Sequence, residues 1–488
     1  MRFVTKLAGL LVMSGALLGA ATAMAADYSQ LRKGLGIPRS AAVGAAGLKD
    51  GETMKVLVEL APIVKPAMGI LSASGSAVDQ LGLRGIQDLV EFKHLPLLSL
   101  SATPEVIERL VESNLVSRVM VDDIHVVNMS QSNDIIRSGE AWKRGARGKG
   151  VSVAVLDTGV DTRHKAFAGR IAGEACFSSS GSFKGNRVTS ACPGKRRSST
   201  AVGSGRDCPS AYECSHGTHV AGTVAGGDAG YGGVAPAAKI VAVQVFSLVD
   251  GPACGRSRKC VTAYTSDIIN ALEWVYDKRK SMKIAAVNMS LGGGRYKGTC
   301  DREAIARAIN LLDSAGVAVV IAAGNEGYDN SVASPACVSR AITVGSTDKR
   351  DRVSSFSNSN KVMDMWAPGG SIRSAVPGGG YGTKSGTSMA APHVAGAFAI
   401  MRAAYPNAPL EDLTKMVVNN GPRIRHRSSG LTRNRLDVAA VYAAASKRWG
   451  DGKGGGDNDN DKPDDGKKGG GGLLDVVPGL GGLLGGDR

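Results

Sequence analysis

Short apolar segments alternate with helix-like segments through the middle of the chain. The apolar segments are rich in Val, Ile and Ala and predict buried strands at 151–157, 239–245, 284–290 and 319–324. The patterns between them predict helices at 266–278 and 301–315. This order predicts an α/β fold with a mostly parallel sheet that is covered on both faces and joined by right-handed crossovers. In such sheets, functional side chains lie beyond the carboxyl ends of the strands.

A smaller set of elements precedes this region. Alternation of polar and apolar residues predicts strands at 54–60, 95–100 and 116–121. Residues 102–111 predict a helix in which Thr103 is the N-cap and Pro104 occupies the first helical position. We therefore expect a separate α+β module within residues 26–128.

Four segments carry side chains that are suited to acyl transfer. Asp157 ends the first strand, His216 opens a glycine-containing helix, and Ser388 lies among small residues at a predicted helix start. A serine in that setting exposes its Oγ and lies near backbone N–H groups that can face a developing negative charge. Asn325 follows the last of the four strands and suits an oxyanion-stabilising donor. The order Asp, His, Ser, with gaps of 59 and 172 residues, forms a triad only if the fold brings the three together.

Each of these residues also has a simpler structural explanation. Asp157 can cap a turn, Asn325 can close one, and His216 with His219 can present two metal ligands from one helical face. No third ligand is evident, and the glycine-rich spacing is unfavourable for a zinc site. The joint occurrence of all four segments favours the catalytic interpretation.

The four motifs resemble those of the subtilisin-like serine proteases (subtilases, peptidase family S8): Asp-Thr-Gly at 157–159, His-Gly-Thr-His at 216–219, Ala-Gly-Asn at 323–325 and Gly-Thr-Ser-Met-Ala at 386–390. The resemblance covers roughly residues 130–445 and is closest to secreted bacterial and proteinase K-like members. It implies a three-layer domain in which Asp157 orients the imidazole, His216 is the general base and then the general acid, and Ser388 attacks the carbonyl carbon. Asn325 and the Ser388 backbone N–H are implied to bind the oxyanion, and His219 matches a structural position.

The resemblance also assigns two walls of a substrate groove, formed by Ser290, Leu291, Gly292 and Gly293 on one side and by Ala323 and Gly324 on the other. Small residues on both sides leave room for a large side chain, and no acidic residue is evident at the base of the pocket. We therefore expect broad, apolar-leaning cleavage of protein and peptide substrates. In the simpler explanation, these glycines only permit tight turns.

Catalysis by this triad is expected to need no cofactor, but bound calcium is common in the family. Asp364 matches one calcium ligand of the family, so the resemblance implies structural Ca²⁺ at this residue. The alternative is an ordinary carboxylate at the end of a strand.

The N-terminal module resembles the propeptide of subtilases, which assists folding and inhibits the enzyme until it is cleaved. Residues 124–130 are then expected to pass through the active site as the first substrate, with the cut between about Val121 and Ser132. This division assigns residues 26–128 to the propeptide and 129–449 to the catalytic domain. An unrelated N-terminal binding domain is the alternative.

Both ends of the chain differ from the rest in composition. A positively charged start, an apolar core at 10–20 and small residues at 23–25 predict a secretory signal peptide over 1–25. That core is too short to span a bilayer and no later run is long enough, so we expect no transmembrane segment. The Gly- and Asp-rich residues 450–488 predict a disordered tail.

The chain contains eight cysteines, all within the expected catalytic domain, and an even count in an exported chain predicts disulfides. Cys254 and Cys260 suggest one small loop. The resemblance implies a bridge between Cys300 and Cys337, and the pairing of the other four cysteines, within 176–214, is left open.

The formal net charge of +16 predicts a basic surface, which includes arginines at 423, 425, 427, 433 and 435. Aromatic residues make up only 5% of the chain and do not interleave with the basic clusters, so platforms for base stacking are absent. We therefore expect solvated faces and no nucleic-acid partner.

The sequence as a whole predicts a secreted, monomeric endopeptidase that processes its own precursor, with its propeptide as an intramolecular inhibitor. A catalytically silent binding protein is the first rival, and the presence of all four catalytic positions counts against it. An esterase or lipase is the second. The chain lacks a Gly-x-Ser-x-Gly elbow, and its Asp, His, Ser order is opposite to that of the α/β-hydrolases.

Overall fold

The computed structural model describes residues 53–61, 78–83, 86, 88–122, 124–127, 134–212, 214–227 and 232–451. All of them belong to the first of two compact units, residues 1–455. The predicted signal peptide, the part of the expected cleavage region at 128–132 and the predicted tail beyond Asp451 lie outside the described residues.

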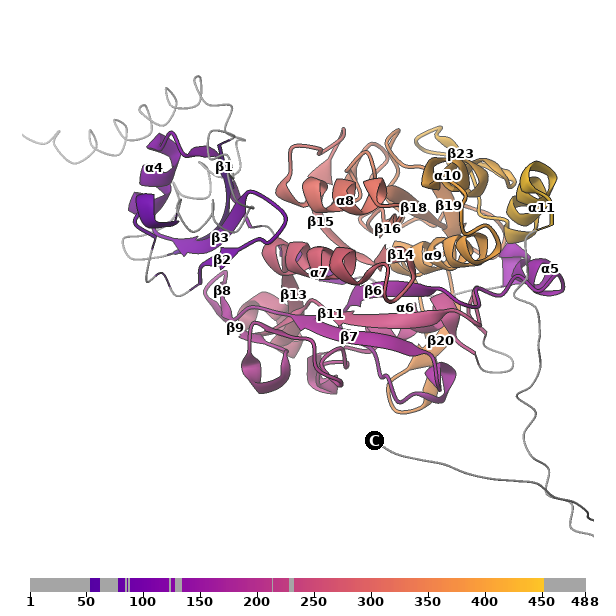
Figure 1. Ribbon diagram of the computed structural model, residues 1–488, viewed down its shortest axis with the longest axis horizontal. Helices are drawn as coiled ribbons and strands as arrows, with labels where there is room; N and C mark the ends of the chain where they lie inside the picture. Colours follow the sequence, from indigo (N-terminus) through magenta and orange to yellow (C-terminus); the bar gives the residue numbers. More distant parts are fainter. Residues whose placement is uncertain are drawn as a thin grey trace, which may run out of the picture. The chain divides into compact units, whose positions relative to one another are not determined.

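An eight-stranded sheet forms the centre of the catalytic region, in the order β10-β7-β11-β6-β14-β16-β18-β19 (Figure 1). Its strands are β6 (Ser152–Asp157), β7 (Ile171–Phe177), β10 (Ser198–Ser199), β11 (Lys239–Gln244), β14 (Ile284–Met289), β16 (Ala318–Ala322), β18 (Ile342–Thr347) and β19 (Met365–Pro368). All neighbouring pairs are parallel except β10 and β7. Every residue of β6, β14, β16 and β18 is buried, as expected for apolar strands covered on both sides. The predicted α/β fold with a mostly parallel sheet is confirmed.

Helices cover both faces of this sheet. Along β6, Val153 and Val155 pack on the side of α6 and α9, whereas Ala154 and Leu156 pack on the side of α7 and α8. Successive side chains of a strand point to opposite faces, so this alternation produces three layers. The covering helices are α6 (Ser215–Ala225), α7 (Thr265–Lys278), α8 (Ala304–Ser314) and α9 (Thr387–Ala404), with α5 (Ser138–Trp142), α10 (Leu410–Asn419) and α11 (Val438–Trp449) added on the α9 side.

The two helices predicted at 266–278 and 301–315 correspond to α7 and α8. α8 starts later than expected because its N-cap, Glu303, has an extended backbone with φ −67° and ψ 145°. The small residues of α9 allow it to lie against its neighbours at close range. A Cβ on Gly396 would lie only 2.6 Å from the Cβ of Val234.

The N-terminal region contains a separate antiparallel sheet in the order β2-β3-β1-β4. Its elements are β1 (Met54–Leu60), β2 (Val90–Glu91), β3 (Leu97–Ala102), α4 (Pro104–Glu112) and β4 (Val116–Val121). Val58, Leu100 and Leu110 belong to a hydrophobic core of its own. The predicted strands and helix of this module are therefore present.

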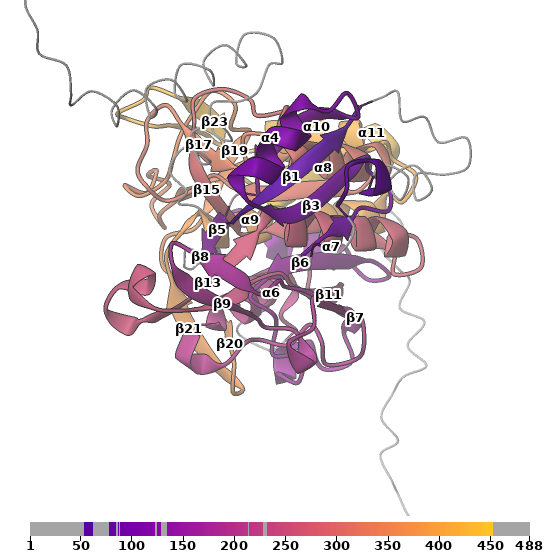
Figure 2. The same ribbon diagram turned by 90° about the vertical axis from the view of Figure 1, so that its left-hand side faces the viewer.

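A second, antiparallel assembly of strands runs in the order β17-β15-β5-β13-β12-β9-β8. Its members are β5 (Ile124–Val127), β8 (Gly181–Phe183), β9 (Asn186–Ser190), β12 (Ser247–Asp250), β13 (Lys259–Tyr264), β15 (Leu291–Tyr296) and β17 (Val332–Ser334). β5 lies between β13 and β15 and is antiparallel to both (Figure 2). This strand follows directly on the N-terminal module in sequence. Two hairpins complete the fold: β20 (Ile372–Val376) with β21 (Gly380–Lys384), and β22 (Arg423–Arg425) with β23 (Thr432–Asn434).

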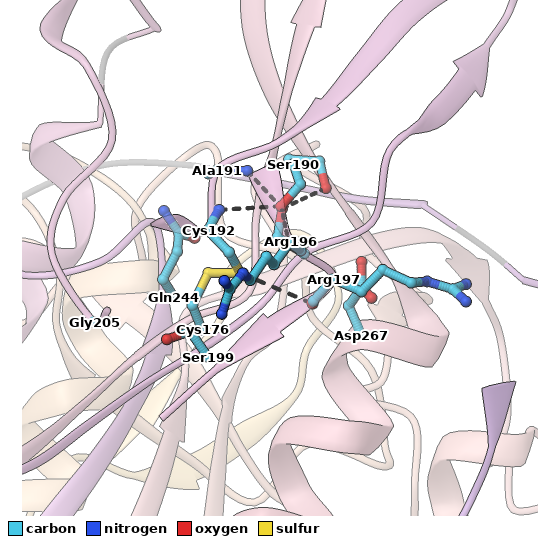
Figure 3. The surroundings of a disulfide bond; sticks show 12 residues. Cys176, Ser190, Ala191, Cys192, Arg196, Arg197, Ser199, Gly205, Gln244 and Asp267 are labelled. Carbon is cyan, nitrogen blue, oxygen red and sulfur yellow. Dashed lines mark hydrogen bonds between the residues drawn. A yellow bond between two sulfur atoms is a disulfide. The ribbon is translucent and has the colours of Figure 1, made fainter. Parts of the chain in front are cut away.

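All eight cysteines form disulfides, in the pairs Cys176–Cys192, Cys208–Cys214, Cys254–Cys260 and Cys300–Cys337. Figure 3 shows the first pair, where Ser190 Oγ donates to the carbonyl of Arg196 and accepts the N–H of Cys192. This bridge ties the turn after β9 to β7. Disulfides formed under oxidising conditions stabilise mainly by restricting the unfolded chain.

No helix in the described ranges is long and apolar enough to cross a membrane.

Candidate active site

Asp157 and His216 form a fully buried pair at the carboxyl edge of the central sheet. Asp157 is the last residue of β6, and His216 is the second residue of α6. The His216 Nδ1 and the Asp157 Oδ1 are 2.7 Å apart, and both side chains have 0% exposure. The same carboxylate oxygen accepts the backbone N–H of Thr158 at 2.7 Å. A carboxylate on Nδ1 holds a proton there and leaves Nε2 as the nitrogen for proton transfer.

Glycine makes this approach of α6 to β6 possible. A Cβ on Gly217 would lie 2.1 Å from the carbonyl oxygen of Gly159, and Gly159 itself has a φ of +87°. Thr158 joins the two motifs, because its Oγ1 donates to the carbonyl of Cys214 at 3.1 Å and accepts the Gly217 N–H at 3.0 Å. The glycine of His-Gly-Thr-His is therefore explained by contact between the two segments. The glycine of Asp-Thr-Gly is required by its positive φ and by the carbonyl oxygen of Arg206, which a Cβ there would approach to 2.0 Å.

Ser388 is the second residue of α9 and is held against the end of β14. Its Oγ donates to the carbonyl of Ser290 at 3.2 Å, and the Ser290 Oγ donates to the carbonyl of Ser388 at 2.6 Å. Asn288 Nδ2 in turn donates to the Ser290 Oγ at 2.9 Å. The first turn of a helix leaves its backbone N–H groups without intrahelical partners, so the Ser388 N–H is placed to bind an anion.

Asn325 lies just beyond the end of β16 and is oriented by Thr387. The Asn325 Oδ1 accepts the backbone N–H of Thr387 at 2.7 Å and its Oγ1 hydroxyl at 3.1 Å. Thr387 Oγ1 also accepts the Gly324 N–H at 3.1 Å. Because the amide oxygen is occupied, Nδ2 is the group of Asn325 that can donate to a ligand. The sequence did not predict this role of Thr387, because its motif indicated only the neighbouring Ser388 as a functional residue.

The groove predicted at Ser290–Gly293 is a strand edge that already holds a strand. Leu291 and Gly292 of β15 pair with Val127 and Val126 of β5. On its other side, β5 pairs with β13. β13 was not predicted to line the groove, although its apolar residues at 261–264 are a strand signal.

At the opposite wall that the resemblance implies, an acidic residue lies beside Gly324. A Cβ on Gly324 would lie 2.3 Å from Asn358 Nδ2 and 2.9 Å from Glu326 Oε2. The Asn358 Nδ2 donates to that Glu326 oxygen at 2.6 Å. Glu326 therefore lies near the expected wall, whereas the sequence showed no acidic residue at the base of the pocket. Asn358, 32 residues further along the chain, holds Glu326 there, and that contact is not visible in the sequence.

His219 has a structural position, as the resemblance implied. Burial, with smaller contributions from Lys384 and His216, lowers the pKa of His219 to about 3, so its ring is neutral. Its Nε2 bonds to the carbonyl of Ile372 at 3.1 Å, whereas His216 faces Asp157. Within the described ranges, no three His, Cys, Asp or Glu side chains are grouped so that they could hold a metal ion.

The surroundings of Asp364 do not fit the Ca²⁺ site that the resemblance implied. Asp364 Oδ2 accepts the N–H of Thr343 at 2.7 Å, and the Thr343 carbonyl accepts the Asp364 N–H at 3.0 Å. Burial raises the pKa of Asp364 to about 6, with the Arg433 guanidinium acting in the opposite direction. Calcium requires several oxygen ligands and favours clustered carboxylates. Asp364 is a single buried carboxyl that faces a backbone amide and a guanidinium group, so the several oxygen ligands that calcium requires are not assembled around it.

The comparisons with known proteins agree with this geometry. The model of the subtilase family (Peptidase S8) matches residues 148–459. The "Major intracellular serine protease" of Bacillus subtilis (strain 168) is 35% identical over 298 residues, which cover 60% of this chain and 81% of that protein. The "Alkaline protease" of Shouchella clausii is 35% identical over 328 residues, 66% of this chain and 73% of that protein.

A solved structure titled "Crystal structure of a cold adapted subtilisin-like serine proteinase" is 33% identical and covers 60% of this chain and 90% of its own, with a TM-score of 0.45. The family assignment does not depend on it. The family match spans more than half of the 488 residues, and it includes Asp157, His216, Asn325 and Ser388. This chain belongs to the subtilase family and is a serine endopeptidase.

Proposed function

We propose that the chain is the precursor of an exported endopeptidase that removes its own N-terminal module and then cleaves proteins with a broad, apolar-leaning preference. The single observation that carries this proposal is the position of β5. An extended segment just after the module pairs with β13 and β15, where the family resemblance places a substrate. A peptide bound as a third strand gains main-chain hydrogen bonds on both sides.

The proposed mechanism assigns one task to each group of the site. Asp157 keeps the proton on His216 Nδ1, so Nε2 accepts the Ser388 Oγ proton as that oxygen attacks the carbonyl carbon. The same Nε2 then gives the proton to the leaving amine. Asn325 Nδ2 and the Ser388 backbone N–H donate to the oxygen that becomes negative. Since Ser388 lies in the first turn of α9, its N–H is available for this purpose.

The contacts between the N-terminal module and the catalytic region support an inhibitory role for the module. Asp122 Oδ1 accepts the N–H of Ser266 at 2.7 Å, in the first turn of α7, where a carboxylate is favoured by the helix dipole. Further along α7, the Glu273 carboxylate accepts the backbone N–H groups of Lys93 at 3.1 Å and His94 at 2.8 Å. The module therefore contacts α7 through hydrogen bonds to buried carboxylates, in addition to the pairing of β5 with β13 and β15.

Export and a monomeric state complete the proposal. Four disulfides are typical of an oxidising compartment, which supports the signal peptide expected at residues 1–25. The proposed triad, the oxyanion donor and both sides of the groove come from one chain, so the mature enzyme needs no second copy to complete its site. The proposed bond that is cut lies between 121 and 132.

Replacing the nucleophile tests catalysis and processing together. We expect Ser388→Ala to reduce turnover by several orders of magnitude, because the members of a serine triad act as a unit. The variant should also retain the module, whereas the wild type should lose it. Intact mass and casein digestion measure the two effects. A variant that is processed like the wild type would show that another protease makes the cut.

The preference for apolar residues is tested with peptides that differ only in the residue before the cut. Leu, Phe and Met are expected to give the highest kcat/KM, because the family resemblance assigns small residues to both walls of the groove and burial of apolar surface is favourable. Cleavage mainly after Lys or Arg would contradict the proposal and would assign the Glu326 carboxylate a direct role in specificity.

Thr387→Val tests whether Thr387 positions Asn325. The change removes the two hydrogen bonds of the hydroxyl, to Gly324 N and Asn325 Oδ1. At about 1 kcal/mol each, their loss is expected to lower kcat about thirtyfold. KM should change little, since the oxyanion forms only during the reaction. Thr414→Val on α10 is the matched control. An increase in KM with unchanged kcat would refute the positioning role.

Glu273 is expected to make release of the cleaved module depend on pH. Burial raises the pKa of Glu273 from its ordinary value of 4.5, with the His94 and Lys93 N–H groups of the module acting in the opposite direction, so the complex holds this proton more tightly than a solvent-exposed carboxyl does. Binding of the module should therefore weaken as the pH rises above 4.5 through the raised pKa. Activity after processing should then appear faster at the higher pH.

The neutral variant Glu273→Gln should flatten this dependence and delay activation at high pH. The exposed Glu411→Gln on α10 serves as the control. Progress curves of activation across the pH range measure both. Equal pH profiles for the wild type and Glu273→Gln would rule out a role of this carboxyl in release.

A further inference from the structure

A cavity of about 660 Å³ lies outside the proposed catalytic groove, next to the β22–β23 hairpin. Arginines dominate its charged lining, with Arg352, Arg423, Arg425 and Arg427 opposite Asp348 and Asp351. Val353, Phe356 and Ile424 add apolar surface. Neither the proposed catalytic mechanism nor the contacts of the N-terminal module use this cavity, which we name the arginine groove.

Two of the five arginines in this part of the sequence have structural roles. Arg433 donates to the carbonyls of Met363 and Lys361, at 2.6 and 2.7 Å. Arg435 pairs with Asp351 at 3.0 and 3.1 Å and has a side chain that is only 7% exposed. These two residues anchor the hairpin to the rest of the catalytic region.

The other three, Arg423, Arg425 and Arg427, are exposed and lie at alternate positions. Among the described residues, no carboxylate pairs with any of their guanidinium groups. Both carboxylates of the groove are already engaged, Asp351 by Arg435 and Asp348 by Arg352 at 2.7 Å. Three cations therefore remain uncompensated beside a cavity.

The intervening residue Ile424 is held in place by a hydrogen bond to its backbone carbonyl. Its carbonyl accepts the indole N–H of Trp366, a fully buried side chain, at 3.2 Å. β22 therefore has a defined register, in which Arg423 and Arg425 fall on the same side of the strand. Alternate residues of a strand are about 6.6 Å apart. An extended polypeptide repeats its side chains at the same distance, so carboxylates at alternate positions can match these guanidinium groups.

We propose that the arginine groove is an exosite that binds acidic, extended segments of protein substrates. Guanidinium groups bind carboxylates through paired N–H donors, and the apolar lining can contact the rest of the segment. Phe356 and His426 supply the two aromatic rings of the lining, and Trp, Tyr or further Phe side chains, which would offer nucleic-acid bases several stacking surfaces, are absent from its described residues. This proposal rests only on the endopeptidase activity and does not require self-processing.

The arginine groove is linked to the segment that carries the catalytic serine by a short path through the backbone. Gly370 lines the groove, and the carbonyl of its neighbour Gly369 accepts the N–H of Gly386 at 3.1 Å. Gly386 lies two residues before Ser388. A substrate held in the groove by its acidic segment is therefore kept close to the site, which raises its effective concentration there. We expect this to lower KM and leave kcat unchanged.

Binding is tested first, on the full-length Ser388→Ala protein, with a fluorescent peptide that alternates Glu and Ser. We expect the combined variant Arg423→Gln, Arg425→Gln, Arg427→Gln to weaken binding about tenfold, because it removes three exposed guanidinium–carboxylate pairs. The control variant Arg144→Gln, Lys149→Gln, Lys239→Gln removes the same charge from exposed positions elsewhere. Its affinity should change less than about twofold. The combined Arg→Lys variant should be intermediate, because it keeps the charge and loses the paired donors.

Turnover is tested with the active enzyme. A substrate that carries the Glu-Ser segment should show a higher KM with the groove variant, whereas a short neutral peptide should be cleaved equally by all variants. Equal weakening by the control variant would show that net charge alone is responsible and would overturn the proposal. Groove-dependent binding of oligo-dT or a polysulfate in place of the acidic peptide would overturn it as well.

Discussion

The catalytic geometry depends on how closely the start of α6 approaches the end of β6. Gly217 and Gly159 meet at a distance that leaves no space for a side chain, since a Cβ on Gly217 would lie 2.1 Å from a main-chain oxygen. Even one extra methylene in a packed interior costs about 1–3 kcal/mol, and here the obstacle is main chain. The hydrogen bond between Asp157 and His216 depends on this contact. Both side chains are buried, so they can reach each other only if the backbones of β6 and α6 approach closely.

The order of the parallel strands gathers the other groups at the same edge. β6, β14 and β16 are adjacent in the sheet, and Asp157, Ser290 and Asn325 lie at or just beyond their carboxyl ends. α9 begins at this edge with Ser388 in its first turn, where the Ser388 Oγ donates to the carbonyl of Ser290 and the Thr387 N–H donates to the Asn325 Oδ1. One layer of strands thus supports the proposed base, the proposed nucleophile and the proposed oxyanion donor together.

Charged groups are used differently on two parts of the surface. Between the N-terminal module and α7, Asp122 and Glu273 are buried and accept backbone N–H groups. These directed hydrogen bonds take the place of the water that would otherwise solvate the two carboxylates. At the β22–β23 hairpin, Arg423 and Arg425 remain exposed without carboxylate partners among the described residues. The first arrangement holds a segment of the same chain, and the second is suited to a ligand from outside.

The sequence by itself determined four strands of the central sheet (β6, β11, β14 and β16), the helices α7 and α8 and the elements of the N-terminal module, and it proposed Asp157, His216, Asn325 and Ser388 as site residues, because apolar periodicity and short motifs are local properties. It left Thr387, Glu326 with Asn358, and the β13 edge of the groove unassigned. These features depend on contacts between segments that are distant in the chain, such as the 32 residues between Glu326 and Asn358. The division of the arginines at 423–435 into anchors and free groups also required the fold, since only burial and partners distinguish residues that look alike in sequence.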